Sequence, residues 1–167
     1  KNLILLDISE YSLYELVREI NSVGKDFPIV PVIGSVQDRQ FLRTLFQKFQ
    51  IDTIFHAAAY KHVSLMEQNV LQCFANNVLG TADLANEAIN NKIERFVLVS
   101  TDKAVNPTNF MGASKRCAEL LCRSFAQKSQ ITHFSIVRFG NVLGSSGSVV
   151  PLFKEQIASG GPVTVTH

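Results

Sequence analysis

The sequence predicts an α/β protein built on a doubly wound parallel sheet. Two observations predict this class: short, nearly continuous apolar runs alternate with longer segments that carry apolar residues at helical spacing, and the alternation extends through all 167 residues. Continuous apolar runs are typical of strands that are buried on both faces. Strands that alternate with helices lie parallel and are joined by right-handed crossovers, so ligands bind beyond the carboxyl ends of the strands.

Each apolar run predicts one strand. In chain order the runs are "NLILLD" (2–7), "FPIVPVIG" (27–34), "DTIFHAA" (52–58), "RFVLVST" (95–101) and "HFSIVRF" (133–139).

The segments between these runs predict the helices. The first two are expected at 9–23 and 38–49, opened by Ser9 and Asp38 as capping residues. Apolar and small residues at helical spacing predict further helices at 66–91 and 109–128, with a shorter helix after Pro151. We expect a single domain over 1–167, in which the region from about 140 onward begins a substrate-binding part.

Composition narrows the function classes. The 16 basic and 14 acidic side chains are scattered along the chain with a net charge of +2, which argues against a nucleic-acid partner. No apolar run reaches the roughly 18 residues that a membrane-spanning helix needs, so we expect this stretch to be soluble. The 3 cysteines lie in apolar runs and predict a reducing, cytoplasmic setting. Without CxxC or HExxH spacing we expect no metal site.

The carboxyl ends of the predicted strands define one candidate site. It gathers Asp7 and the segments 57–61, 100–103 and 140–147.

Two of these segments have both a functional and a structural interpretation. Asp7 fits an acid that accepts hydrogen bonds from an adenosine ribose, although acids at strand ends also cap helices or face water. The alanines at 57–59 leave room for a flat or phosphorylated ligand, or let a helix pack tightly on the sheet. The G-x-G-x-x-G loop of such folds is absent, and we expect it before Lys1.

The segment "STDKAVNPTNFMGASK" (100–115) carries the sharpest chemistry. Helical spacing puts Met111 and Lys115 on the same stripe as Ala118 and Cys122. A lysine on such a stripe needs a polar partner, unless its stem lies along the apolar surface and its amine reaches water.

Four stretches in order resemble the polysaccharide-biosynthesis (CapD-type) branch of the extended short-chain dehydrogenase/reductases: "LILLDISEYSLYEL", "DTIFHAAAYKHVSLME", "STDKAVNPTNFMGASKRCAE" and "VRFGNVLGSSGSVVPLFKEQIASGGPVTVTH". Members of this branch include UDP-N-acetylglucosamine 4,6-dehydratases. The resemblance implies a Rossmann-type fold, NAD as cofactor, UDP-N-acetylglucosamine or a related UDP-sugar as substrate, and a role in surface polysaccharide or capsule synthesis. It also implies a middle fragment that lacks the first strand and most of the carboxyl-terminal substrate region, and it is compatible with a homo-oligomer.

The resemblance implies roles for individual residues. Lys115 is similar to the lysine of the Y-x-x-x-K signature, which holds the nicotinamide ribose. The other implied cofactor-binding residues are Asp7, Asp38, Ala57, Ala58 and Ala59. The expected substrate-binding residues are Lys61, Arg138, Asn141, Ser145 and Gly147.

Met111 departs from the signature, because most of the superfamily carries tyrosine there. A thioether cannot take the proton of a sugar hydroxyl. Methionine at this place resembles the larger, membrane-anchored members, so we expect a parent protein anchored at the cytoplasmic face of the inner membrane. Two alternatives stay open: a UDP-sugar 4-epimerase or reductase, which would need the tyrosine, and a catalytically inactive nucleotide-binding or assembly module.

The implied dehydration needs one base and one acid. Oxidation at carbon 4 acidifies the hydrogen on carbon 5; a base removes it, an acid protonates the departing 6-hydroxyl, and hydride returns to carbon 6. We expect Lys103 as the base, Asp102 as the acid kept protonated by burial, and Thr101 at the 4-hydroxyl, with Met111 and Lys115 completing the catalytic set. Because the missing first strand belongs at the centre of the sheet, we expect residues 1–167 alone to be inactive and to bind NAD poorly.

Overall fold

The computed structural model describes residues 2–24, 27–142 and 149–164. The strands are β1 (Leu3–Asp7), β2 (Ile29–Ile33), β3 (Thr53–His56), β4 (Arg95–Thr101) and β5 (His133–Phe139). The helices are α1 (Glu10–Ser22), α2 (Arg39–Lys48), α3 (Val63–Gln68), α4 (Val70–Phe74), a π-helical turn (Ala75–Leu79), α5 (Gly80–Asn90), a 3-10 turn (Asp102–Ala104), α6 (Phe110–Lys128) and α7 (Val149–Ala158). Within these described ranges, no helix combines the length and the apolar character that crossing a membrane requires.

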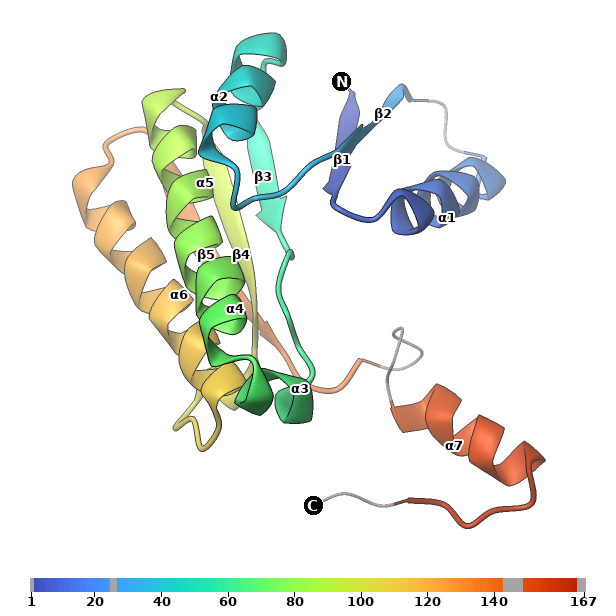
Figure 1. Cartoon of the computed structure of the whole chain (residues 1–167). Helices are drawn as coiled ribbons and strands as arrows, with labels where there is room; N and C mark the ends of the chain where they lie inside the picture. Colours follow the sequence, from blue (N-terminus) through green and yellow to red (C-terminus); the bar gives the residue numbers. More distant parts are fainter. Residues whose placement is uncertain (1, 25–26, 143–148, 165–167) are drawn as a thin grey trace.

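In the part of the chain that the structure describes, every strand pair is parallel, as predicted, but the strands form two sheets, β1–β2 and β3–β4–β5. In Figure 1 the β1–β2 pair, covered by α1, lies to one side of β3. β1 and β3 are not paired with each other in the described ranges. The break falls where the common strand order of doubly wound sheets places its central strand, in agreement with the expectation.

Helices cover one face of the three-stranded sheet. α5 and α6 run along this face, and α2 lies beside α5 (Figure 1). Phe96 and Leu98 of β4 are fully buried there. Phe55 and Val137 alternate with inward-facing residues of their strands and are 73% and 37% exposed, so apolar residues on the second face remain open to solvent.

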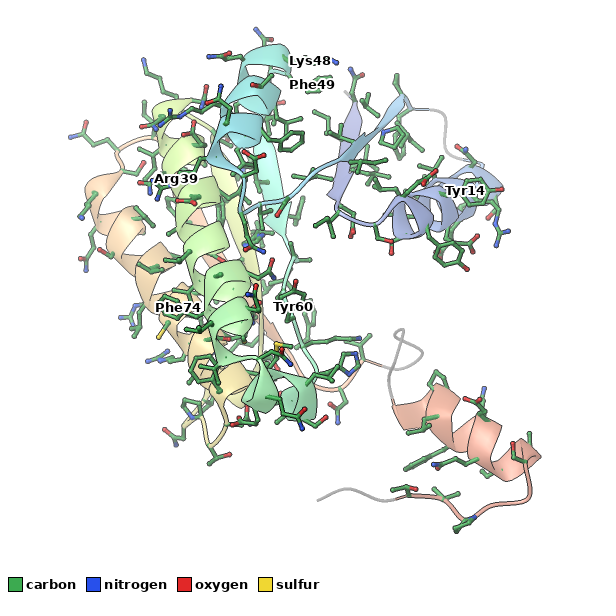
Figure 2. All side chains as sticks on the ribbon, viewed as in Figure 1. Tyr14, Arg39, Lys48, Phe49, Tyr60 and Phe74 are labelled. Atoms are coloured by element: carbon green, nitrogen blue, oxygen red, sulfur yellow. The ribbon has the colours of Figure 1, made fainter. Side chains whose placement is uncertain are left out.

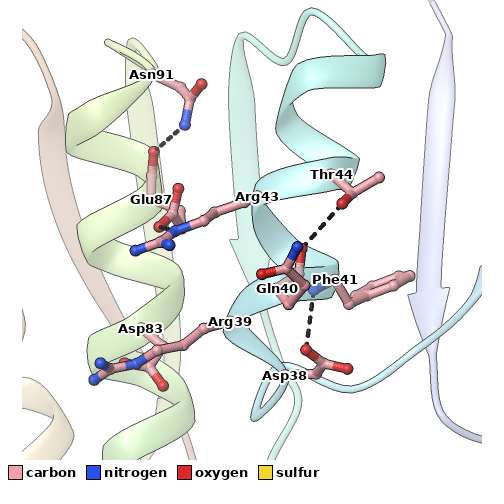
Figure 3. Close-up of polar contacts among 9 residues, drawn as sticks. All are labelled: Asp38, Arg39, Gln40, Phe41, Arg43, Thr44, Asp83, Glu87 and Asn91. Atoms are coloured by element: carbon pink, nitrogen blue, oxygen red, sulfur yellow. Dashed lines mark hydrogen bonds and ion pairs between the residues drawn. The ribbon is translucent and has the colours of Figure 1, made fainter.

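Two ion pairs fasten α2 to α5 (Figure 3). Arg39 pairs with Asp83 at 2.7 Å, and Arg43 pairs with Glu87 at 3.3 Å. The two arginines are four residues apart in α2 and the two carboxylates are four residues apart in α5, so the pairs lie one above the other on the facing sides of the helices. The contact fixes the amino-terminal end of α2, where Asp38 is the cap.

The prediction of one continuous helix over 66–91 is wrong. Its first part begins earlier, at Val63, and the chain leaves helical conformation at Asn69, whose side-chain amide donates to the Leu65 carbonyl at 2.9 Å. Asparagine favours such local bonds over the helix ladder. The π-helical turn that follows contains Asn77, which is 1% exposed.

Candidate functional site

The carboxyl ends of β4 and β5 lie side by side. The parallel register pairs Thr101 of β4 with Phe139 of β5. The next residues therefore leave the sheet at the same edge: a Cβ atom added at Gly140 would lie 3.7 Å from Oδ2 of Asp102. This is the edge at which open α/β sheets bind ligands.

Four polar side chains meet at this edge. The Thr101 hydroxyl donates to Oδ1 of Asp102 at 3.0 Å. The amine of Lys103 lies 3.4 Å from the same oxygen and 3.4 Å from Oδ1 of Asn141. The structure thus brings together the three predicted acid-base residues and one predicted substrate-binding residue.

The Asp102 carboxylate is open to water, with 58% of its side chain exposed, against 39% for Lys103. The hydrogen bond from Thr101 is the main cause of a lowered pKa at Asp102, and Lys103 acts in the same direction. The expectation that burial keeps Asp102 protonated is therefore wrong, because the side chain is exposed and its pKa is lowered. An acid role for Asp102 requires a bound ligand that covers it.

The 3-10 turn that carries Asp102 and Lys103 packs tightly on the start of α6. Asn109 caps this helix by accepting from the Gly112 N–H at 2.8 Å, and Glu67 accepts from the Phe110 N–H at 2.6 Å. A Cβ atom at Gly112 would lie 2.3 Å from the Lys103 carbonyl oxygen. Only glycine allows the helix and the turn to approach this closely.

Lys115 and Met111 are both buried, at 6% and 4% exposure. The Lys115 amine donates to the Val99 carbonyl at 2.7 Å, and burial lowers the pKa of this lysine. The structure thus gives this lysine a polar partner in the backbone of β4. Met111 packs in an apolar cluster with Met66 and Cys73, as a core residue does.

The predicted dinucleotide residues lie on both sheets. Asp7 ends β1, is exposed, and accepts from the Ser9 N–H at 2.8 Å. Ala57 and Ala58 follow β3 and are exposed, while Ala59 is half-buried.

Asp38 is the cap of α2 and accepts from the Phe41 N–H at 2.9 Å. It also lines an open groove with Ser35, Gln37, Arg39, Gln40 and Asp83. Across the described part of the chain, no group of His, Cys, Asp or Glu side chains is arranged to hold a metal ion.

The predicted substrate-binding residues are less closely grouped. Lys61 is exposed on the segment between β3 and α3. Arg138 points its Nε and Nη2 at the Glu119 carboxylate, at 2.7 and 2.6 Å, and a substrate contact for it stays a prediction. Ser145 and Gly147 lie outside the described residues.

Sequence reasoning missed Asn77 and Glu119. The Asn77 amide accepts from the Tyr60 N–H at 2.8 Å and donates to the Tyr60 carbonyl and to the Ser114 hydroxyl, both at 3.0 Å. Tyr60 lies on the segment that leads from β3 to α3 (Figure 2), so Asn77 holds this segment against α6. Glu119 follows Lys115 by four residues, a spacing that places both on one side of the helix and could have indicated it.

Comparison with known proteins agrees with the fold and confirms the family resemblance seen in the sequence. The family described as polysaccharide biosynthesis protein matches residues 1–167. The capsular polysaccharide biosynthesis protein CapD of Staphylococcus aureus is 48% identical over 168 residues, which are 100% of this chain and 28% of CapD. The UDP-N-acetylglucosamine 4,6-dehydratase (inverting) of Campylobacter jejuni is 37% identical over 94% of this chain and 48% of that protein.

A third relative has a different activity by name. The UDP-glucose 4-epimerase of Rickettsia rickettsii is 43% identical over 70% of this chain and 35% of that protein. Among solved structures, Pen from Bacillus thuringiensis superposes with a TM-score of 0.90 at 37% identity, over 100% of this chain and 50% of that chain. The chain thus spans half the length, or less, of each protein named.

Proposed function

Because this chain belongs to the polysaccharide biosynthesis protein family, we propose that the whole protein is an NAD-dependent 4,6-dehydratase that acts on UDP-N-acetylglucosamine. One observation carries the proposal: at the carboxyl end of β4, the Thr101 hydroxyl and the Lys103 amine both lie within hydrogen-bonding reach of the Asp102 carboxylate. A dehydration needs an acid and a base side by side. The Campylobacter jejuni relative carries this activity in its name.

The residues present fit a dinucleotide. Asp7 presents an exposed carboxylate at the end of β1, and Ala57 and Ala58 expose only small side chains after β3, so a flat cofactor can approach the backbone. Lys115 uses one of its three amine donors on Val99, and we assign the others to ribose hydroxyls. NAD, when bound, supplies the oxidation at carbon 4 and the hydride for carbon 6.

The polar cluster supplies the proton transfers. As carbon 4 is oxidised, Thr101 takes the proton of the 4-hydroxyl and passes its own to Asp102, to which it already donates a hydrogen bond. Lys103 then removes the proton from carbon 5 of the 4-keto sugar, Asp102 gives its proton to the departing 6-hydroxyl, which leaves as water, and Lys103 returns a proton to carbon 5. A sugar lying over Asp102 displaces the water around its carboxylate and raises its pKa, which opposes the lowering by the hydrogen bond from Thr101. Asn141, 3.4 Å from the Lys103 amine, orients that amine toward the sugar.

The setting we propose is the cytoplasmic face of the inner membrane, with an anchor elsewhere in the parent protein. Cys73, Cys117 and Cys122 are free thiols, in agreement with a reducing compartment.

A 4-epimerase is the second candidate, because of the Rickettsia relative. Both reactions need a group that takes the proton of the 4-hydroxyl, and Met111, buried among apolar side chains, cannot be that group in either of them. Only dehydration also needs an acid-base pair for carbons 5 and 6, and Asp102 and Lys103 would have no such task in an epimerase. The site therefore favours dehydration.

The product distinguishes the candidates. We expect the full-length protein, incubated with NAD and UDP-N-acetylglucosamine, to form a 4-keto-6-deoxy sugar, identified by NMR. Lys103→Ala should lower turnover by about 10²-fold or more, whereas Lys128→Ala, at the far end of α6, should leave it unchanged. Formation of UDP-N-acetylgalactosamine would establish the epimerase, and failure of the intact protein to convert the sugar would support the inactive binding module.

A further inference from the structure

A buried carboxylate joins three elements behind the proposed site. Glu119 of α6 is 1% exposed. Ser100 at the end of β4 donates to its Oε1 at 2.8 Å, and Arg116 donates to its Oε2 at 2.9 Å. Arg138 of β5 contacts both oxygens, at 2.7 and 2.6 Å.

Hydrogen bonds keep the Glu119 carboxylate ionised. Burial alone would oppose its ionisation, but hydrogen bonds from Arg138, Ser100 and Arg116 outweigh burial and lower the pKa of Glu119 to about 2. The paired contact with Arg138 has the two-point geometry of strong, charge-assisted hydrogen bonds.

Glu119 and its partners lie close in sequence to the segments that carry the proposed proton transfers. Ser100 directly precedes Thr101, and Arg138 is three residues before Asn141. Lys115 lies one helical turn before Glu119. None of the hydrogen bonds that Glu119 makes in the described part of the chain involves Asp102 or Lys103.

We propose that Glu119 and Arg138 are positioning residues for the dehydratase reaction. Their contact locks the ends of β4 and β5 to α6, and this sets the spacing of the Asp102, Lys103 and Asn141 side chains that follow. The inference rests on the proposed function and gives Arg138 a role that acts through Glu119 in place of direct substrate contact. A displacement near 1 Å at an active site can cost about 10²-fold in rate, so small movements of these strand ends matter.

The first test is Glu119→Gln in the full-length protein. This variant keeps the shape of the side chain but removes the charge, and its amide N–H groups face the N–H groups of Arg138. We expect kcat per folded molecule to fall about 10- to 100-fold. The KM for UDP-N-acetylglucosamine and the Kd for NAD should stay within about 2-fold, because the positioning role gives Glu119 no contact with either ligand.

Glu87→Gln is the matched control. Glu87 is also a carboxylate shielded from water, with 10% of its side chain exposed, and it pairs with Arg43 between α5 and α2. We expect this control to lose stability without a loss of kcat. If Glu119 only stabilised the fold, Glu119→Gln would behave like Glu87→Gln and lose stability without a loss of kcat.

Arg138→Lys separates positioning from direct binding. Lysine cannot reproduce the two-point contact, so positioning predicts a lower kcat at unchanged KM. A raised KM with normal kcat would instead make Arg138 a substrate ligand and overturn the inference. If Glu119→Gln does not fold, Ser100→Ala takes its place, because it removes a single hydrogen bond to Glu119. A lowered kcat at unchanged KM supports the positioning role, and a normal kcat overturns it.

The failures are distinguishable. An active parent protein whose Glu119→Gln variant keeps normal kcat overturns the positioning role and leaves the dehydratase intact. A parent protein that forms no 4-keto product overturns both.

Discussion

The contact between Gly112 and the Lys103 carbonyl gives the sharpest structural prediction. A methyl group added by Gly112→Ala would lie 2.3 Å from that oxygen, whereas real Cβ contacts stay beyond 3.0 Å. The 3-10 turn must therefore move away from α6 by about 0.7 Å, and Lys103 moves with it. Overpacking costs about 1–3 kcal/mol, and alanine returns about 1 kcal/mol of helix propensity, so the net loss of stability is only about 0–2 kcal/mol. A shift near 1 Å can cost about 10²-fold in rate, so we expect kcat to fall about 10- to 100-fold.

The assay compares urea denaturation with 4-keto sugar formation by the full-length protein. Gly80→Ala is the control, because its added methyl group would also meet a close neighbour, a methyl group of Val36 at 2.9 Å, but this neighbour does not belong to the polar cluster. We expect the Gly80 variant to change stability alone. If Gly112→Ala keeps more than half of the parental kcat, the tight seating of the 3-10 turn on α6 does not position Lys103.

Three further predictions concern the fold and the cofactor. Leu98→Ala should lower the free energy of unfolding, measured in urea, by about 2–5 kcal/mol, because Leu98 is fully buried. Leu120→Ala is the control and should change this free energy by less than about 0.5 kcal/mol, because Leu120 is 48% exposed. Equal effects of the two substitutions would contradict the observed core. Folding lowers the pKa of Glu119 from 4.5 to about 2, so its ionised form adds stability that is fully present above about pH 4.5 and is lost as the pH falls toward 2. Glu119→Gln should therefore flatten the dependence of the free energy of unfolding on pH in this range. A pH dependence parallel to that of the parent protein would count against the ion pair. Residues 1–167 alone should bind NAD weakly, because β1 and β3 are not joined in one sheet; a micromolar Kd in calorimetry would show that the cofactor site is complete without a further strand.

Local signals predicted much of the fold. The bounds predicted for the fourth and fifth strands, 95–101 and 133–139, are those of β4 and β5. Ser9 and Asp38 cap their helices through their side chains, as expected. These features depend on residues close together in the sequence, where apolar runs and capping side chains act directly.

The remaining features depend on contacts between distant segments. The break at Asn69 depends on a side-chain hydrogen bond that competes with the helix, and the spacing of apolar residues gives no sign of it. The spacing from Lys115 could have indicated Glu119, but its partners Ser100 and Arg138 come from distant segments that only β4 and β5 bring to it. The exposure of Asp102 was mispredicted for the same reason, since nothing in the described ranges folds over the end of β4 to bury it.

The most direct test of the proposed chemistry is the position of solvent deuterium in the product. The full-length protein would be incubated with NAD and UDP-N-acetylglucosamine in deuterium oxide, and the sugar analysed by NMR. Proton removal from carbon 5 by Lys103 predicts a 4-keto-6-deoxy product with one deuterium at carbon 5. A 4-keto-6-deoxy product without deuterium at carbon 5, or a 4-epimer in its place, would contradict the account.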